Sequence, residues 1–446
     1  MTTLRKLATL LACVLAGGVV SLVPAGAATP NLQVGINDDA GYEASVASFF
    51  MPTMQSEGLK VNALTIRWDD TQPTMIDPTV ESNIQQVIAS AATAGVTVEL
   101  DLYPLHSQVF TDNLKCVPSK SPLACGDSAK IQQFATWTAQ VAQTFPSVHQ
   151  FIVMNECNQP LFVNPQWNTT GLNQSAAICG RALAAAYDAL KAVSPTNFVW
   201  GVGLSPRGND KPGAPSNSST SPVRFLGYLG AWFKAFALAT HRTAPLMDGL
   251  DFHPYPVPQS LNFTTGYANK YDASISNLPR IYQAFYYGFN GTPQRTIGQQ
   301  RGGGLPVSLN EMGIQTDAAH LLGYQGIKVS ANAAGGMVGA YATQAYQATY
   351  YKQMLDLLAC DPNVRLINIF HLVDEPNLTG WQSGLYWFSA GTPIPKQSAQ
   401  VVQSWIATTG GRCQGQIVKW RPTPATTLTQ KSAGQTGKGK VGSKKG

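Results

Sequence analysis

Eight short apolar runs recur between residues 32 and 372, and each is bounded by polar, Gly or Pro residues. Most are rich in Val, Ile, Leu and Phe, which suits strands buried on both faces of a parallel sheet. The predicted strands cover residues 32–37, 63–68, 96–103, 151–156, 198–203, 249–253, 305–311 and 366–372.

Longer segments with a helical alternation of apolar and polar residues lie between most of these strands. One of them starts at Asp77-Pro78, which is typical of a helix N-cap followed by proline at the first helical position. The predicted helices cover residues 78–94, 130–145, 175–193, 225–240, 271–287, 341–359 and 397–408.

Strands that alternate with helices indicate parallel pairing through right-handed crossovers. Eight such units predict an α/β fold, a closed (β/α)₈ TIM barrel that forms a single domain over residues 28–413. An open doubly wound sheet is the alternative. It fits less well, because no glycine-rich phosphate loop follows the first strand.

The N-terminus has the features of a signal peptide over residues 1–27. Two basic residues precede an apolar run over residues 7–20, and Ala25-Gly26-Ala27 offers a small-residue cleavage site. A membrane anchor is the alternative, but the apolar stretch is short and is interrupted by glycines and Pro24. We therefore expect a secreted protein.

Positive charge is concentrated at the C-terminus. Seven Lys and Arg residues and no acid lie in residues 414–446, whereas the whole chain has a net charge of only +6. The predicted barrel is therefore slightly acidic, which does not favour nucleic-acid binding. We expect residues 414–446 to be a basic disordered tail; electrostatic contact with an anionic cell wall is the alternative. We expect a monomer.

Six cysteines follow the signal peptide, an even number that favours disulfides in a secreted chain. Fifteen pairings are possible for six cysteines. The absence of a CxxC motif or a Cys/His cluster argues against a structural metal site. Local spacing favours the pairs Cys116–Cys125, Cys157–Cys179 and Cys360–Cys413.

Two glutamates end strongly apolar predicted strands, where a solvated surface role is difficult to reconcile with the pattern. Glu156 ends the fourth strand and Glu311 ends the seventh. In a TIM barrel these strand ends meet at the open mouth that carries the active site. Two carboxyl groups about 5–5.5 Å apart suit retaining glycoside hydrolysis. Arg67, at the end of the second strand, is placed to keep the attacking carboxylate ionised.

The residues around these glutamates resemble clan A glycoside hydrolases. Asn155-Glu156 is similar to the Asn-Glu signature of the clan, and residues 154–160 and 252–256 resemble segments of family 39-like and cellulase-like actinobacterial members. The resemblance implies that Glu156 is the acid/base, that Glu311 is the nucleophile, and that Asn155 hydrogen-bonds the sugar 2-hydroxyl. Arg67 matches the arginine on the second strand of the clan.

The sequence departs from the pattern of the clan at two positions. Met154 stands where a Trp is usual, and Cys157 stands where a Pro is usual. A disulfide between Cys157 and Cys179 would restore the rigidity that the proline supplies. Neither change removes a catalytic group.

Four further residues are predicted to bind substrate, each with a purely structural alternative. An indole after the eighth strand can stack on the apolar face of a sugar ring, and histidine or tyrosine side chains can hydrogen-bond a sugar hydroxyl or orient the nucleophile. Packing inside the domain, or a plain loop position, is the alternative in each case. These residues are His106, His253, Tyr255 and Trp381.

These observations predict a retaining glycoside hydrolase that cleaves O-glycosyl bonds of an oligo- or polysaccharide by double displacement, with no cofactor. A non-catalytic carbohydrate-binding or cell-wall-associated barrel is one alternative, which a Gln or Ala at position 156 or 311 would favour. A transglycosylase is another, and it would share the same residues.

Overall fold

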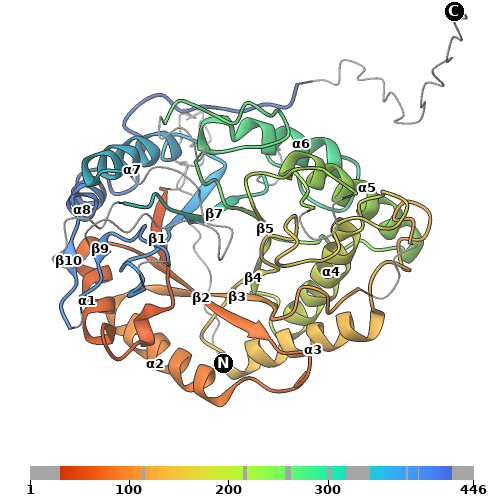
Figure 1. Cartoon of the computed structure of the whole chain (residues 1–446), viewed down its shortest axis with the longest axis horizontal. Coiled ribbons are helices and arrows are strands. Elements are labelled where there is room, and N and C mark those ends of the chain that lie inside the picture. Colours follow the sequence, from red (N-terminus) through yellow and green to blue (C-terminus); the bar gives the residue numbers. More distant parts are fainter. Residues whose placement is uncertain are drawn as a thin grey trace, which may run out of the picture. The chain divides into compact units, whose positions relative to one another are not determined.

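The computed structural model describes residues 31–111, 116–213, 218–256, 263–298, 304–316, 342–377, 380–389 and 391–423. Eight parallel strands close into a barrel in the order β1 to β8, with β8 pairing back onto β1 (Figure 1). The predicted (β/α)₈ barrel is therefore confirmed, and the open sheet is excluded. The strands are β1 (Gln33–Asn37), β2 (Val61–Trp68), β3 (Thr97–Pro104), β4 (Gln150–Val153), β5 (Phe198–Leu204), β6 (Gly249–Phe252), β7 (Val307–Met312) and β8 (Val364–Ile369).

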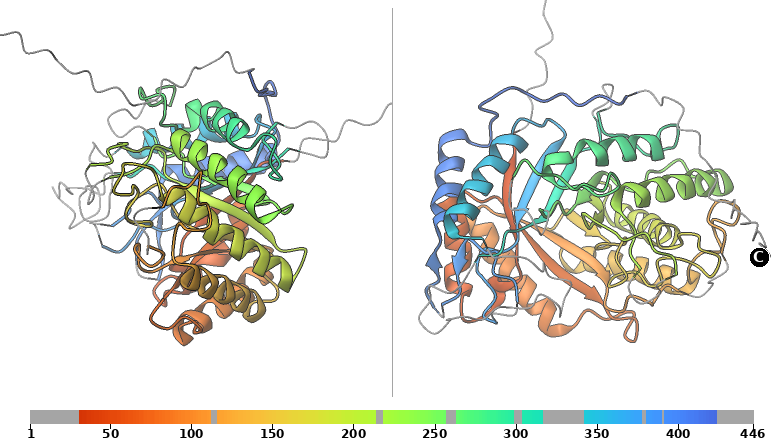
Figure 2. Two further views of the ribbon diagram at one scale, coloured as in Figure 1. Left: turned by 90° about the vertical axis from the view of Figure 1, so that its right-hand side faces the viewer. Right: turned by 45° about the horizontal axis from the view of Figure 1, so that its top comes forward.

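Helices lie along the outer side of the strands (Figure 2). Two of them start as the sequence directs, since the carboxylates of Asp77 and Asp127 accept hydrogen bonds from backbone N–H groups of the first turns of α2 and α3. The helices are α1 (Ala47–Glu57), α2 (Pro78–Ala94), α3 (Ser128–Thr144), α4 (Ser175–Val193), α5 (Pro222–Thr240), α6 (Pro279–Phe289), α7 (Gln344–Leu358) and α8 (Gln397–Thr409).

Two helical segments differ from the sequence prediction. The prediction missed α1, which contains Pro52, because an interior proline is a strong argument against a helix. The prediction of a helix over residues 271–287 was wrong at its start. The segment Ile275–Asn277 forms a 3₁₀ turn with Ser274 and Asn277 as a capping box, and α6 begins at Pro279.

The interior of the barrel is unusually polar for this fold, whose interior is generally filled by branched aliphatic side chains. Glu99, Asp101 and Asp251 are buried inside it, together with Asn310 and Asn368. Asn368 donates to Asn310 Oδ1 at 2.6 Å. Burial raises the pKa of Glu99 to about 8 and the pKa of Asp101 well above its usual value. This layer lies on the strands that carry the candidate site.

The three disulfides favoured by local spacing are all present, which resolves the fifteen possible pairings: Cys116–Cys125, Cys157–Cys179 and Cys360–Cys413. A short antiparallel pair, β9 (Tyr386–Trp387) and β10 (Ile394–Pro395), follows β8. Within the described ranges, no helix combines the length and apolar character needed to cross a bilayer. The predicted signal peptide and residues 424–446 of the predicted tail lie outside the described residues. The prediction of a disordered tail was wrong for residues 414–423, because the ring of Trp420 packs 5.7 Å from that of Tyr282 and Thr423 hydrogen-bonds to Gln283, with Tyr282 and Gln283 both on α6.

Candidate active site

The chain turns sharply after β4 and thereby carries Glu156 to the mouth of the barrel. Met154 and Glu156 have positive φ values of 71° and 36°, which non-glycine residues rarely adopt. The Glu156 N–H donates to the carbonyl oxygen of Gly203 on β5 at 2.7 Å. The disulfide between Cys157 and Cys179 ties the turn to α4. These restraints fix the backbone on both sides of the carboxylate.

Gly203 lets β5 approach this turn closely. Its φ of 41° lies in the left-handed region. A Cβ atom at this position would lie 3.2 Å from both Asn155 Oδ1 and His253 Nε2. Any larger residue would therefore displace two of the predicted site residues.

Glu311 lies within β7, in a position set by the regular strand rather than by a turn. The hydroxyl of Tyr255 donates a hydrogen bond to Glu311 Oε2 at 3.1 Å. Tyr255 follows β6, and its side chain is buried. A donor aimed at a carboxylate favours the ionised form, which is the form that a nucleophile requires.

The two glutamates meet although they lie 155 positions apart in the chain. One carboxylate oxygen of Glu156, one of Glu311 and a ring nitrogen of His253 all lie within 4.8 Å of one another. Retaining glycosidases place their two carboxyl groups about 5–5.5 Å apart, whereas inverting enzymes need about 6.5–9.5 Å to admit a water molecule. The geometry can therefore support direct attack by one carboxylate while the other transfers a proton.

His253 lies between the two glutamates and is completely buried. Its Nδ1 is 3.3 Å from Glu156 Oε1 and 3.5 Å from Glu311 Oε2, and its Nε2 is 3.4 Å from Asp251 Oδ2. Burial disfavours the charged ring, but the negative charge of Glu311 and the contacts with Asp251 and Glu156 raise the pKa of His253 well above its usual value. The imidazole therefore supplies positive charge between two acids.

The pKa of Glu311 is raised from 4.5 to about 7, as the net result of opposing effects. Burial raises it, and the charge of Glu156 raises it further, whereas His253 and the hydrogen bond from Tyr255 lower it. The contacts of Glu311 with His253 and Tyr255, which lower its pKa, are strongest when Glu311 is ionised. They are the means by which the fold keeps a buried carboxylate available as a base or nucleophile.

The glutamates lie in a pocket of about 420 Å³. Asn155 also lines this pocket; it is buried, and its Oδ1 has no hydrogen-bond partner. Trp381 lines the pocket too, with its ring centroid 5.3 Å from that of Tyr255. An aromatic surface beside a free amide oxygen offers both a stacking face and an acceptor to a polyol ring.

Three predicted site residues do not line this pocket: Arg67, His106 and His253, of which His253 is completely buried and contacts the two glutamates instead. Arg67 is exposed and makes no hydrogen bond or ion pair with Glu311 in the described part of the chain. His253 and Tyr255 take the place that the sequence prediction gave to Arg67. His106 is also exposed, and its Nδ1 lies 2.7 Å from Asp70 Oδ1, which holds it outside the pocket.

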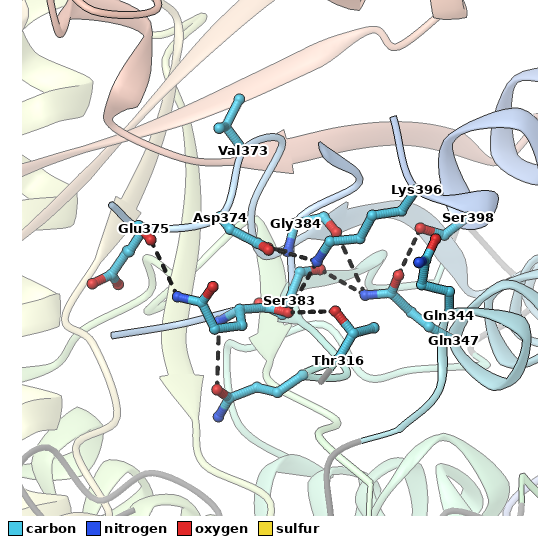
Figure 3. Close-up of polar contacts among 12 residues, drawn as sticks. Thr316, Gln344, Gln347, Val373, Asp374, Glu375, Ser383, Gly384, Lys396 and Ser398 are labelled. Carbon is cyan, nitrogen blue, oxygen red and sulfur yellow. Dashed lines mark hydrogen bonds and ion pairs between the residues drawn. The ribbon is translucent and has the colours of Figure 1, made fainter. Parts of the chain in front are cut away.

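A second group of polar residues, none of them among the predicted site residues, forms the side of the pocket next to β1 and β8. Asp374 follows β8, and its Oδ1 accepts hydrogen bonds from Lys396 Nζ at 2.7 Å and Gly384 N at 2.8 Å (Figure 3). Lys396 is 1% exposed. Asp38 and Asp39 come directly after β1, and this position at a strand end was the signal that could have identified them.

Two clusters have the residue types of a cation site. Asp69, Asp70 and His106 form one, but Lys130 Nζ already lies 3.2 Å from Asp70 Oδ2 and supplies positive charge there. Glu156, His253 and Glu311 form the other. The neighbouring acids raise the pKa of His253 well above its usual value, which favours the protonated ring, and a protonated imidazole has no lone pair for a metal. The arrangement is therefore better suited to acid–base chemistry.

Known proteins resemble this chain in sequence over part of its length and in fold. The profile of the cellulase family, glycosyl hydrolase family 5, matches residues 36–212. A sequence search of curated proteins finds no match.

Several solved structures share the fold. A family 39 glycoside hydrolase from the gut symbiont Bacteroides cellulosilyticus WH2 is 14% identical, with a TM-score of 0.51 over 84% of this chain and 63% of that chain. This chain therefore spans less than two thirds of the length of that protein. A GH5-4 broad specificity endoglucanase from Clostridum cellulovorans is 13% identical, with a TM-score of 0.51 over 84% of this chain and 94% of that chain.

A beta-glucosidase from Thermotoga maritima, in complex with deoxynojirimycin, is 13% identical, with a TM-score of 0.50 over 84% of this chain and 88% of that chain. At these identities, the structural neighbours establish the barrel fold. Together with the family match, the comparisons identify a glycoside hydrolase domain.

Proposed function

We propose that the glycoside hydrolase domain cleaves O-glycosyl bonds of an oligo- or polysaccharide with retention, using Glu311 as the nucleophile and Glu156 as the acid/base. The observation that carries the proposal is the approach of the two carboxylates to within 4.8 Å in a solvent-connected pocket. The structural neighbours include glycosidases, which supports a β-linked glycan as substrate.

In the first step, Glu311 attacks the anomeric carbon while Glu156 protonates the leaving oxygen, so one C–O bond forms as the other breaks. In the second step, Glu156, now ionised, takes a proton from water, and that water displaces Glu311 and releases the sugar. Tyr255 and His253 stabilise the ionised nucleophile between turnovers. Asn155 offers its unpartnered oxygen to a sugar hydroxyl, and Trp381 offers a stacking face.

The experiment is a screen of the purified chain against aryl β-glycosides and plant or bacterial polysaccharides, with Glu156→Gln and Glu311→Gln as variants. We expect Glu311→Gln to lose at least about a thousandfold in kcat/KM on every substrate. Glu156→Gln should keep more activity on aryl glycosides with acidic leaving groups, because these need little protonation.

Full activity in both variants would refute the site assignment. A parent protein that binds glycans but cleaves none would support a carbohydrate-binding barrel instead. A product assay with an acceptor sugar separates hydrolysis from transglycosylation.

We also propose that the protein is secreted as a monomer, with residues 1–27 removed and the basic residues beyond 423 forming a solvated disordered tail; contact of that tail with an anionic cell wall is the alternative. Three disulfides support an oxidising compartment, because such bonds are rare where thiols are kept reduced. N-terminal sequencing of the exported protein and its elution volume in size-exclusion chromatography test these two points.

A further inference from the structure

One side of the active-site pocket is strongly acidic. The loop after β1 contributes Asp38, Asp39 and Glu43, and the loop after β8 contributes Asp374 and Glu375. We refer to these five residues as the acidic wall. Arg207 is the one Lys or Arg that lines the pocket among the residues that the structure describes.

The two loops form one continuous surface. Asp38 Oδ2 accepts hydrogen bonds from the backbone N–H groups of Leu372 and Val373 at 3.0 and 3.2 Å. The charges of these loops also act on one another. Burial raises the pKa of Asp38 to about 7 with a contribution from Glu43, and burial raises the pKa of Asp374 to about 6 with a contribution from Asp38. Both shifts oppose ionisation of the buried carboxyl groups, and a ligand cation at the wall would favour it.

Positive charge from the protein reaches two members of the wall. The charge of Arg67 lowers the pKa of Asp39, which burial raises to about 7. Lys396 neutralises Asp374 from the interior, since it is 1% exposed. In the described ranges, neither Glu43 nor Glu375 has a cationic side chain within ion-pair distance. Glu43 is exposed and Glu375 is half-buried, so both can be reached from the pocket that they line.

Two buried polar atoms on the same side lack a partner. Asp374 is 2% exposed, and its Oδ2 has no hydrogen-bond partner, although its Oδ1 accepts two hydrogen bonds. His371 is 8% exposed, and its Nδ1 also has no partner. Both residues line the pocket. Buried polar groups are nearly always satisfied, so unpartnered atoms at a pocket wall point to a ligand that supplies the missing contacts.

We propose that the acidic wall binds a sugar residue with a free ammonium group, so that the substrate is a glycan with N-deacetylated amino-sugar units. This inference rests on the proposed glycosidase function. An ammonium group would donate up to three hydrogen bonds and would offset the uncompensated charge of the wall. A uronate would meet like charge in the same position and is disfavoured.

The first test measures binding rather than turnover. Tetramers of β-1,4-linked glucosamine, glucose and glucuronate share a backbone and differ in charge. They are titrated calorimetrically into the Glu156→Gln variant, which retains every residue of the acidic wall. At about pH 6, where an amino group is protonated, we expect the glucosamine tetramer to bind at least about fivefold more tightly than the glucose tetramer. This preference should shrink at high salt, and the glucuronate tetramer should bind most weakly.

The second test removes charge from the wall. Glu43→Gln and Glu375→Gln, made in the Glu156→Gln background, should each reduce the ratio of glucosamine to glucose affinity by about two- to threefold, and the combined variant by more. Glu81→Gln in the same background is the matched control. It removes one acid from the first turn of α2, outside the pocket, and should leave the ratio unchanged.

Equal affinity for the glucosamine and glucose tetramers, or a preference that the wall variants do not reduce, would overturn this inference. If the parent enzyme still cleaves neutral glycans in that case, the proposed function stands. If the parent cleaves no glycan of any charge while the glucosamine preference is present, the acidic wall is supported and the glycosidase proposal fails.

Discussion

The hydroxyl of Tyr255 provides the sharpest test of how the fold keeps Glu311 ionised. Tyr255→Phe removes the donor to Glu311 Oε2 at 3.1 Å and keeps the ring. The packing of the ring against Trp381 and Phe370, at centroid distances of 5.3 and 6.4 Å, can therefore persist. The substitution therefore removes little more than one hydrogen bond to Glu311.

The expected magnitude follows from the geometry. A hydrogen bond to a charged group contributes about 1.5–3 kcal/mol. Since 3.1 Å is longer than the roughly 2.5–2.7 Å of a strong O–H···O⁻ contact, we take the lower end of this range, about 1.5 kcal/mol. This corresponds to about one pH unit in the pKa of Glu311.

The direction of the expected pKa change is known, because the hydrogen bond from Tyr255 lowers the pKa of Glu311. Its loss raises that pKa, so a smaller fraction of Glu311 is ionised at acidic pH. The acid limb of the profile of kcat/KM against pH should therefore move up by about one unit. The loss of kcat/KM should be about tenfold on that limb and should shrink towards the plateau.

The assay is hydrolysis of an aryl β-glycoside as a function of pH. Tyr187→Phe is the control, because its hydroxyl also donates to a carboxylate at 3.1 Å, that of Asp248, outside the pocket. A loss of the same size at every pH would show that Tyr255 acts through position rather than charge. An acid limb that does not move relative to Tyr187→Phe would refute the reasoning.

Three further predictions concern stability and are measured by denaturant unfolding. Burial raises the pKa of Glu57 to about 7 from 4.5. A carboxyl group whose folded pKa exceeds its unfolded value loses stability as pH rises between the two. Glu57→Gln should therefore gain about 3 kcal/mol relative to the parent between about pH 4 and pH 8, and a constant difference would contradict the shift. The pair Cys157→Ser and Cys179→Ser opens a loop of sequence separation 22 and should lower the free energy of unfolding by about 3 kcal/mol; no loss under non-reducing conditions would argue against the disulfide. Lys396→Met should cost about 3–5 kcal/mol by leaving Asp374 buried and unpaired, whereas adding Asp374→Leu should restore part of that loss; equal losses would show that the pair is not coupled.

Local patterns in the sequence were sufficient to predict the strands of the barrel and most of its helices. The apolar runs located all eight strands because a strand of a parallel barrel is buried on both faces and must be apolar along its length. Helix bounds followed where a cap is encoded locally, as at Asp77 before α2. The prediction of helices failed where no cap is encoded locally, as in α1. This helix contains Pro52 and is stabilised by the packing of its apolar residues in the core.

The sequence by itself also determined which acids end apolar strands, and therefore that Glu156 and Glu311 belong to one edge of the barrel. The tertiary structure alone decided which side chains surround them. Arg67 and His253 both follow the strand-end rule, yet His253 points between the two carboxylates and Arg67 points to solvent. The direction of a side chain at a strand end depends on register and on the loops that cover it. The acidic wall also depends on the tertiary structure, because only closure of the barrel brings the loops after β1 and β8 together.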